Sequence, residues 1–187
     1  MAGSFYVRCR ICVWWQRLAN GDRRLASKRK MYCFVVEQLL TFMIKYNDMR
    51  TVIMKNEQDT RAFGLDLGRS LEKGDIVALV GDLGTGKTAL TKYIAEGLGI
   101  AGPITSPTFT VVQEYHDGRL PLYHFDVYRV YDEDELFEMG YEEYFYGEGV
   151  CVVEWADLIE DLLPPETKLI RIEHGTNPEE RIYQCTF

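Results

Sequence analysis

The sequence predicts an α/β domain built on a sheet of mixed strand direction, and three observations support that prediction. Two short, almost continuous apolar runs, at 75–80 and 149–153, are typical of buried parallel strands. Segments with the apolar spacing of amphipathic helices alternate with strands along the chain. Two pairs of strand-like segments are joined by turn residues, at 116–119 and 175–178, as in antiparallel hairpins. Together these features favour a sheet that combines parallel and antiparallel pairs.

The first half of the predicted domain contains two strands and two helices. A strand at 51–54 precedes Asn56, which suits a helix N-cap because Glu57 and Asp59 follow in the first turn. The apolar face of this helix is expected to consist of Ala62, Phe63, Leu65, Leu67 and Leu71. Gly74 is expected to end the helix. A strand at 75–80 then leads through a glycine-rich turn into a helix at 87–98, which Gly99 closes.

The second half is predicted to be richer in strands. Strands at 108–115 and 122–130 flank the turn at 116–119. A helix at 132–139 begins with four acidic residues, which suit the positive end of a helix. The buried strand at 149–153 follows, and the last two strands are expected at 168–173 and 181–187.

Charge is distributed unequally along the chain. The 187 residues carry a net charge of −8; nine basic and three acidic residues give 1–48 a charge of +6, which leaves −14 for 49–187. We therefore divide the chain into a basic extension at 1–48, poorly ordered or helical, and a folded domain at 49–187. The extension is interpreted as a tail or as the result of a wrongly chosen start codon, since Met31, Met43 and Met49 are possible later starts.

Composition excludes several classes of protein. A hydrophobic content of 47% excludes wholesale disorder, and the chain has no run of 18 apolar residues that would predict a membrane-spanning helix. The acidic body is expected not to bind nucleic acid strongly by itself. Five cysteines, an odd number spread along the chain, favour reduced thiols and a cytoplasmic location.

The residues Gly-Asp-Leu-Gly-Thr-Gly-Lys-Thr at 81–88 match the complete phosphate-binding pattern G-x-x-x-x-G-K-[ST]. A predicted strand precedes the pattern and a predicted helix follows it, as that motif requires. Glycines let the backbone approach closely, so that N–H groups converge on phosphate oxygens at a helix N-terminus. Lys87 is expected to reach the β- and γ-phosphates, and the Thr88 hydroxyl to bind Mg²⁺. The motif refines the fold prediction to a P-loop NTPase-like domain of three layers.

Two acidic residues at strand ends are candidates for a metal or water contact. Glu154 directly follows the buried apolar strand, and Asp126 lies in the sequence His-Phe-Asp at 124–126. The alternatives are a strand-end carboxylate that faces water for Glu154 and a surface residue of an edge strand for Asp126. The segment Ser-Pro-Thr-Phe-Thr at 106–110 is either a loop that senses the γ-phosphate or a simple proline turn.

Several motifs in a fixed order carry a resemblance to a known family. The segments GDLGTGKT, TSPTFTVVQEY, YHFDVYR, ELFEMGYEEYF and CVVEWAD together resemble the TsaE family, the small ATPase of bacterial tRNA threonylcarbamoyladenosine (t6A) biosynthesis. The resemblance runs from about residue 51 to the C-terminus and does not include 1–48. It implies a Mg²⁺-dependent ATPase that is slow alone and acts through the TsaB–TsaD pair, which transfers the threonylcarbamoyl group to tRNA. In that role ATP hydrolysis resets the machinery and does not make the intermediate.

The resemblance also implies roles for particular residues. The ATP phosphates would be held by Leu83, Gly84, Thr85, Gly86, Lys87 and Thr88. Thr88 and Glu154 would hold Mg²⁺, while Asp126 would orient water or the metal.

Further roles are implied outside the phosphate loop. Thr108 would belong to a switch-like segment that takes part in catalysis. Glu57 and Thr60 would lie near the adenine, and Arg181 would approach the nucleotide.

Other functions remain open on the residues alone. A small-molecule kinase shares the phosphate loop but needs a substrate-binding insertion and an Arg-rich lid, and the segment between 99 and 115 is short. A GTPase is disfavoured because no Asn-Lys-x-Asp segment is present. A nucleotide-gated binding module without turnover is the non-enzymatic alternative. The segment 132–148, with eight acidic and no basic residues, is either a docking surface for a basic protein or a solvated helix with buried tyrosines.

Overall fold

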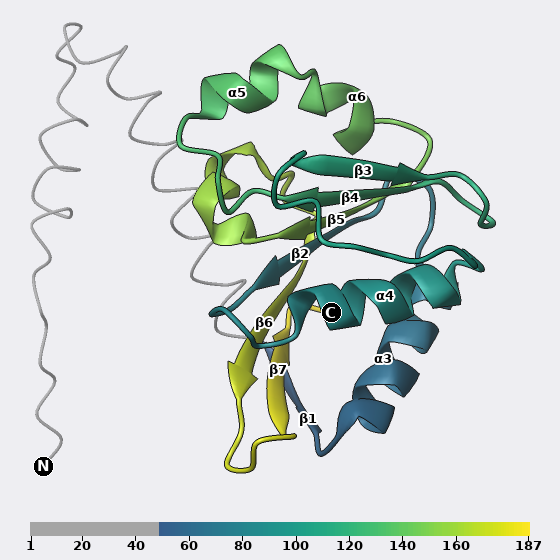
Figure 1. The fold of residues 1–187 in the computed structure, drawn as a ribbon, viewed down its shortest axis with the longest axis vertical. Helices are drawn as coiled ribbons and strands as arrows, with labels where there is room; N and C mark the ends of the chain where they lie inside the picture. The colour runs from purple at the N-terminus through teal and green to yellow at the C-terminus, as the bar shows by residue number, and fades with distance from the viewer. Residues whose placement is uncertain (1–48) are drawn as a thin grey trace, which may run out of the picture. The chain divides into compact units, whose positions relative to one another are not determined.

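The computed structural model describes residues 49–187, which form an α/β unit around one seven-stranded sheet (Figure 1). The strands are β1 (Arg50–Met54), β2 (Ile76–Val80), β3 (Val112–Tyr115), β4 (Leu122–Asp126), β5 (Val150–Glu154), β6 (Lys168–His174) and β7 (Arg181–Cys185). Their order across the sheet is β1-β7-β6-β2-β5-β4-β3. The four central strands are parallel, and the pairs β1–β7, β6–β7 and β3–β4 are antiparallel. The prediction of a mixed sheet is therefore confirmed, whereas the expectations for 1–48 lie outside the described residues.

Helices cover both faces of the sheet. Helices α3 (Glu57–Ser70) and α4 (Lys87–Gly97) lie on one face, and α5 (Glu133–Glu138), α6 (Tyr141–Phe145) and the 3-10 helix η2 (Ala156–Leu162) lie on the other (Figure 1). The alternation of side chains along β4 accounts for this arrangement. Leu122 belongs to the core beneath α3 and α4, whereas the rings of Tyr123 and Phe125 pack on Tyr144 of α6. The predicted three-layer architecture is confirmed.

Glycines bring α3 and α4 close together. A Cβ at Gly68 would lie 2.2 Å from the carbonyl oxygen of Ile94, and a Cβ at Gly97 would lie 2.5 Å from that of Leu65. The buried face of α3 therefore consists of Thr60, Gly64, Leu67 and Gly68. Ala62 is exposed, so its assignment to the apolar face was wrong. Close backbone approach replaces large apolar side chains here, which a search for apolar spacing cannot detect.

Three element boundaries differ from the predictions by more than two residues. The first helix ends at Ser70 with Leu71 as its C-cap, and Gly74 lies in the following turn with φ of 83°. The strand predicted at 108–115 begins only at Val112, because the N–H groups of Thr110 and Val111 both donate to the Pro107 carbonyl and form a turn.

The strand predicted at 122–130 is also shorter than expected. It ends at Asp126, after which the Val130 N–H donates to the Val127 carbonyl in a turn. Helix α6 and the 3-10 helix η2 had no counterpart in the sequence predictions. Among residues 49–187, no helix is long and apolar enough to cross a membrane.

Candidate nucleotide-binding site

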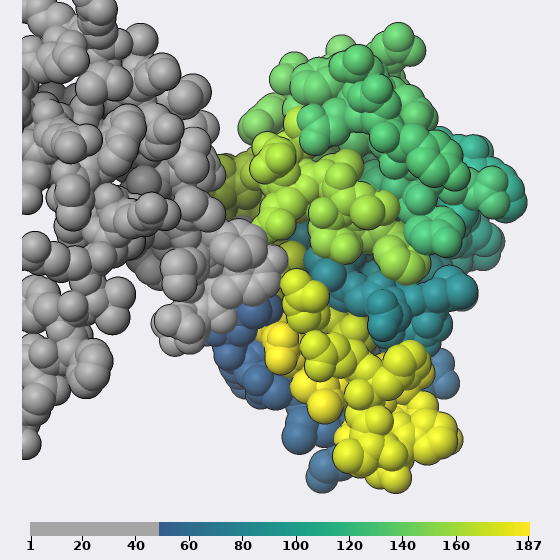
Figure 2. Space-filling view, turned by 90° about the vertical axis from the view of Figure 1, so that its left-hand side faces the viewer, coloured from purple at the N-terminus to yellow at the C-terminus, as the bar shows by residue number. Residues whose placement is uncertain are grey.

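The loop between β2 and α4 has the backbone shape of a phosphate-binding loop. Gly84 and Gly86 have φ of 79° and 100°, in the left-handed region that favours glycine, and Gly86 is the N-cap of α4. A Cβ at Gly81 would lie 2.4 Å from the Ile172 carbonyl oxygen, so only glycine fits between the loop and β6. The N-terminus of an 11-residue helix follows directly, and its free N–H groups can bind an anion. In the space-filling view this teal segment reaches the surface between the lime residues after β5 and the yellow β6–β7 hairpin (Figure 2).

Lys87 curls back over the loop that precedes it. Its Nζ donates to the carbonyl oxygens of Gly81 at 2.6 Å and Asp82 at 3.0 Å, and it lies 3.7 Å from the centroid of the Trp155 ring. Burial lowers the pKa of Lys87, and the nearby carboxylates, Glu154 foremost, act in the opposite direction. The charged ammonium is thus held above the loop, where phosphates would lie.

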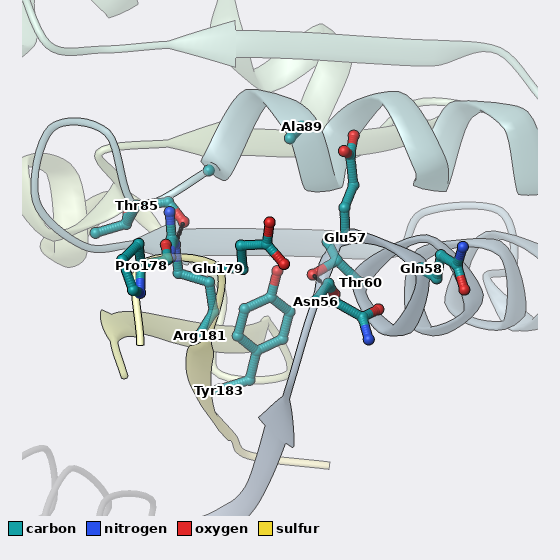
Figure 3. A pocket seen from close by; sticks show the side chains of 11 residues that line it. Asn56, Glu57, Gln58, Thr60, Thr85, Ala89, Pro178, Glu179, Arg181 and Tyr183 are labelled. Carbon is teal, nitrogen blue, oxygen red and sulfur yellow. Dashed lines mark hydrogen bonds between the residues drawn. The ribbon is translucent and has the colours of Figure 1, made fainter. Parts of the chain in front are cut away.

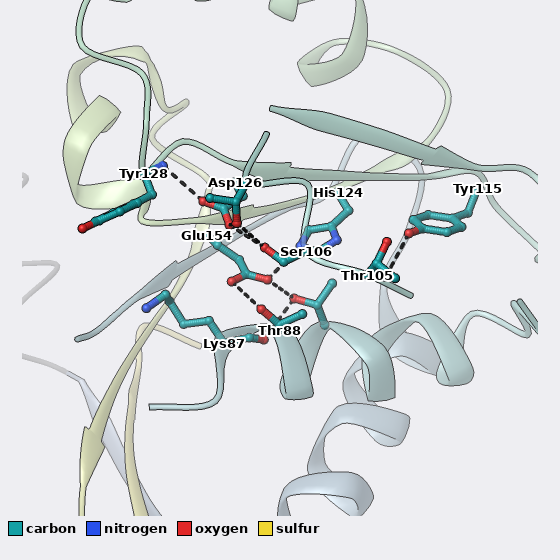
Figure 4. A network of polar contacts seen from close by, with 11 residues as sticks. Lys87, Thr88, Thr105, Ser106, Tyr115, His124, Asp126, Tyr128 and Glu154 are labelled. Carbon is teal, nitrogen blue, oxygen red and sulfur yellow. Dashed lines mark hydrogen bonds and ion pairs between the residues drawn. The ribbon is translucent and has the colours of Figure 1, made fainter. Parts of the chain in front are cut away.

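Glu154 is the centre of a buried polar network at the carboxyl end of β5 (Figure 4). Its Oε2 accepts a hydrogen bond from the Thr88 hydroxyl at 2.9 Å. Its Oε1 lies 2.8 Å from Nε2 of His124 and 3.4 Å from the hydroxyl of Thr91. The Glu154 side chain is 3% exposed, which excludes the alternative of a carboxylate that faces water.

Asp126 connects the end of β4 to the segment that precedes β3. Its Oδ2 accepts hydrogen bonds from the hydroxyls of Ser106 and Thr108, each at 2.6 Å, and its Oδ1 accepts one from the Tyr128 N–H at 3.2 Å. Asp126 is buried, which excludes the alternative of a surface residue. The structure therefore brings Thr108 next to Asp126, as a role for the 106–110 segment at this site would require.

A cavity of about 620 Å³ adjoins the phosphate loop (Figure 3). Its lining residues come from the start of α3, the loop, α4 and the β6–β7 hairpin: Asn56, Glu57, Gln58, Thr60, Thr85, Gly86, Ala89, Pro178, Glu179, Arg181 and Tyr183. The Arg181 Nε donates to the Thr85 carbonyl at 3.0 Å, and its Nη1 donates to the carbonyls of Pro178 and Glu180. Arg181 thus connects the β6–β7 hairpin to the phosphate loop. Glu57, Thr60 and Arg181, which the resemblance places near the nucleotide, all line this cavity.

One residue implied in phosphate binding can serve only through its backbone, and three neighbours of the site were not predicted to act there. The Leu83 side chain is an exposed hydrocarbon, so only the backbone N–H of Leu83 can bind a phosphate. His124 and Thr91 contact Glu154, and Trp155 covers Lys87 with φ of 61°. The period-two spacing of His124 and Asp126 in β4 was the available signal for His124, because it places both side chains on one face.

The residues present fit a magnesium nucleotide. A hydroxyl and a carboxylate at one end of the loop are hard oxygen donors of the kind that Mg²⁺ prefers. Within residues 49–187, no cluster of three or more His, Cys, Asp or Glu side chains could hold a metal ion alone. Magnesium bound on nucleotide phosphates does not require such a cage, because the phosphates and water supply the other ligands.

The sheet order, the loop between β2 and α4, and the acids that end β4 and β5 define an α/β protein with a P-loop-like fold. Residues 54–182 match the model of the family described as Threonylcarbamoyl adenosine biosynthesis protein TsaE, and the chain belongs to this family.

Individual relatives agree with this assignment. A Bacillus subtilis (strain 168) protein named tRNA threonylcarbamoyladenosine biosynthesis protein TsaE is 50% identical over 127 residues, which cover 68% of this chain and 79% of that protein. A Treponema pallidum protein of the same name is 47% identical over 120 residues, covering 64% of this chain and 88% of its own length. The crystal structure of Bacillus subtilis YdiB superimposes with a TM-score of 0.64 at 42% identity, covering 74% of this chain and 84% of that one.

Proposed function

We propose that this protein is a Mg²⁺-dependent ATPase that serves t6A biosynthesis together with the TsaB–TsaD pair. The observation that carries the proposal is the hydrogen bond between Thr88, at the start of α4, and Glu154, at the end of β5. It joins the hydroxyl that follows the phosphate-binding lysine to a buried carboxylate, and this pair of oxygen ligands suits the metal of a bound nucleotide.

The loop supplies phosphate binding. The backbone N–H groups of Leu83, Gly84, Thr85 and Gly86 and the N-terminus of α4 would surround the phosphate oxygens. Lys87 would exchange its carbonyl contacts for the terminal phosphates, because an ammonium binds anionic oxygens more strongly than neutral carbonyls. The cavity beside the loop is where Glu57, Thr60 and Arg181 would accommodate the nucleoside.

The two carboxylates, Glu154 and Asp126, would have different roles in hydrolysis. Magnesium, when bound by Thr88 and Glu154, would neutralise charge that develops on the phosphates. Asp126 lies at the end of the neighbouring strand and would orient the attacking water. Its hydrogen bond with Thr108 would let the 106–110 segment respond to the terminal phosphate.

A protein partner is supported by exposed apolar side chains on the phosphate loop, on the segments that follow Pro107 and Asp126, and on α5. These side chains, each at least half exposed, are Leu83, Phe109, Tyr128, Tyr131 and Phe137. The acidic residues Glu133, Asp134 and Glu135 on α5 lie beside them in sequence and are exposed. Exposed apolar side chains together with neighbouring acidic residues suit a partner that offers both apolar and basic side chains. The alternative for the segment 132–148 was a solvated helix with buried tyrosines. Tyr141 is buried and agrees with that alternative at its own position.

Turnover is expected to be slow without that partner. The Arg129 guanidinium stacks over the Phe109 ring and the Arg181 Nε donates to the Thr85 carbonyl, so each guanidinium is engaged by another group of the chain. A partner that supplied a positive charge would complete the phosphoryl-transfer site.

Phosphate release by the purified chain, measured with and without TsaB and TsaD, tests the proposal. We expect slow release that depends on Mg²⁺ and rises when both partners are added. Phosphate that appears on a small molecule would indicate a kinase instead. Tight ATP binding without any release, alone or with partners, would indicate a nucleotide-gated binding module.

A further inference from the structure

His124 is a buried histidine in the polar network around Glu154. Its side chain is fully buried, and its Nε2 lies 2.8 Å from Oε1 of Glu154. Its Nδ1 is also buried and has no hydrogen-bond partner. No other buried side-chain nitrogen within residues 49–187 lacks a partner, so the ring is satisfied only through its bond with Glu154.

The geometry determines which ring nitrogen carries the hydrogen. An ionised carboxylate only accepts hydrogen bonds, so the hydrogen must be on Nε2 of His124. A hydrogen on Nδ1 would be a second buried donor with no acceptor, which is energetically costly. Within the described residues, His124 therefore donates to Glu154 through Nε2 and to no other group.

That hydrogen bond fixes the rotation of the Glu154 carboxylate. His124 holds Oε1, with a longer contact from the Thr91 hydroxyl at 3.4 Å. Oε2 is left directed at the Thr88 hydroxyl (Figure 4). The backbone arrangement that allows this is the parallel pairing of β4 and β5, in which His124 pairs with Val152, two residues before Glu154. Without the ring N–H, only the longer contact from Thr91 would hold Oε1.

We propose that His124 is a positioning residue, which orients Glu154 so that Oε2 faces Thr88 and the magnesium of a bound nucleotide. The inference rests on the proposed function, because it concerns the metal of that site. Groups that hydrogen-bond to a metal ligand typically change metal affinity or activity by about 10- to 100-fold when they are removed. His124 would act through Glu154 and would not touch the nucleotide.

Three substitutions of His124 separate the effect of its hydrogen bond to Glu154 from the effect of its packing in the core. In His124→Gln the amide nitrogen lies as many bonds from Cα as Nε2 does, so a donor to Glu154 is kept. In His124→Asn the amide nitrogen lies as near to Cα as Nδ1 does and falls short of Glu154. His124→Leu has no donor at all. Phe125→Leu is the matched control, because Phe125 is buried in the same strand but faces α6.

The readout is the affinity for a fluorescent ATP analogue in Mg²⁺ divided by its affinity in EDTA. We expect this ratio to fall about tenfold in the Leu and Asn variants, to stay within about threefold of wild type in the Gln variant, and to be unchanged in Phe125→Leu. Affinity in EDTA should be unchanged in all four. Wild-type ratios in both the Leu and Asn variants would overturn the inference while leaving the proposed function intact. Failure of the wild-type chain to bind the analogue would overturn the proposed function, and the inference with it.

A measurement on the unmodified side chain covers the case in which these variants do not fold. The chain has three histidines, so nitrogen-15 NMR of histidine-labelled protein can assign the His124 ring. We expect a hydrogen on Nε2, none on Nδ1, and a shift of the Nε2 signal in Glu154→Gln. A ring with its hydrogen on Nδ1, or a signal that Glu154→Gln does not move, would overturn the inference.

Discussion

Asp126 and Glu154 are register partners in the parallel pair β4–β5, and each is the last residue of its strand. Carboxyl ends of parallel strands meet at one edge of a sheet, so two buried acids lie side by side next to the phosphate loop. Their hydrogen-bond partners differ: Glu154 is bonded to Thr88 of α4, and Asp126 is bonded to Ser106 and Thr108. This difference in partners predicts different consequences when each acid is replaced.

Glu154→Gln and Asp126→Asn should affect different steps of the reaction. Gln keeps the size of Glu154 but removes the negative charge from a metal ligand, so the Mg²⁺ concentration for half-maximal hydrolysis should rise by about tenfold or more. Asn at 126 removes the carboxylate that would orient the attacking water, so the hydrolysis rate should fall about 100-fold while ATP affinity changes little. Mg²⁺ titrations of hydrolysis and of ATP binding measure both effects. A Glu154→Gln chain with a wild-type Mg²⁺ curve would show that Glu154 is not a metal ligand.

Lys87→Ala should abolish measurable ATP hydrolysis while the fold survives. The ammonium is a charged donor in a partly dry loop, and its loss is expected to cost about 2–3 kcal/mol, or about 30- to 150-fold in affinity or rate. Thermal unfolding in EDTA provides the control for folding, and ATP binding and phosphate release are the measurements. Undiminished hydrolysis by this variant would disprove the assignment of the phosphate loop.

Arg181→Ala should weaken nucleotide binding without changing the dependence on Mg²⁺. The Arg181 side chain joins the β6–β7 hairpin to the Thr85 carbonyl at the edge of the cavity (Figure 3). Its loss should therefore free the hairpin from the phosphate loop. Removal of one charged hydrogen bond costs about 1.5 kcal/mol, or roughly tenfold in affinity. Arg61→Ala is the matched control, because Arg61 is paired with Glu96 on the exposed side of α3 and α4 and does not line the cavity. Equal effects of the two substitutions would contradict a specific role for Arg181.

Cys151 should make the fold less stable in alkaline solution. Burial raises the pKa of its thiol to about 12, from an ordinary value of 9.0. The unfolded chain therefore loses this proton first, so the stabilising contribution is complete below pH 9 and is lost as the pH rises towards 12. Between pH 8 and pH 10 the free energy of unfolding should fall by about 1 kcal/mol less in Cys151→Ala than in the wild type. Urea unfolding at both pH values measures the difference, and parallel pH dependence in the two chains would contradict it.

The phosphate loop was predictable from the sequence because its requirements are local. Glycines at fixed spacing, a lysine and a hydroxyl between a strand and a helix are sufficient to predict it, and the structure has that order. The strand boundaries at 112 and 126 were not predictable in the same way. The boundary at 112 depends on the Pro107 carbonyl, which accepts two N–H groups and turns the chain before β3, and the boundary at 126 depends on the turn that the Val130 N–H and the Val127 carbonyl close. The residues in both turns have strand-forming character.

Parts of the site required knowledge of the sheet. The sequence indicated Asp126 and Glu154 separately, but only the β4–β5 register makes them neighbours and brings His124 to Glu154. Arg181 meets Thr85 across 96 positions in the chain, and this contact follows from the place of β7 beside β6. Contacts of this kind arise from tertiary structure, and spacing patterns along a single chain do not contain them.

A chain that starts at Met49 should fold, bind ATP and hydrolyse it at the full-length rate. The first strand of the sheet begins at Arg50 and pairs with β7 along its whole length, so this start keeps every strand of the described unit. Met54, at the end of β1, is buried in the core, and the family match begins at the same residue. Limited trypsin digestion of the full-length chain should cut first among Arg23, Arg24, Lys28, Arg29 and Lys30, and then at Lys45, which leaves a stable product of about 16 kDa. Resistance of these sites to trypsin, or a Met49 chain that does not fold, would mean that residues 1–48 are an integral part of the domain.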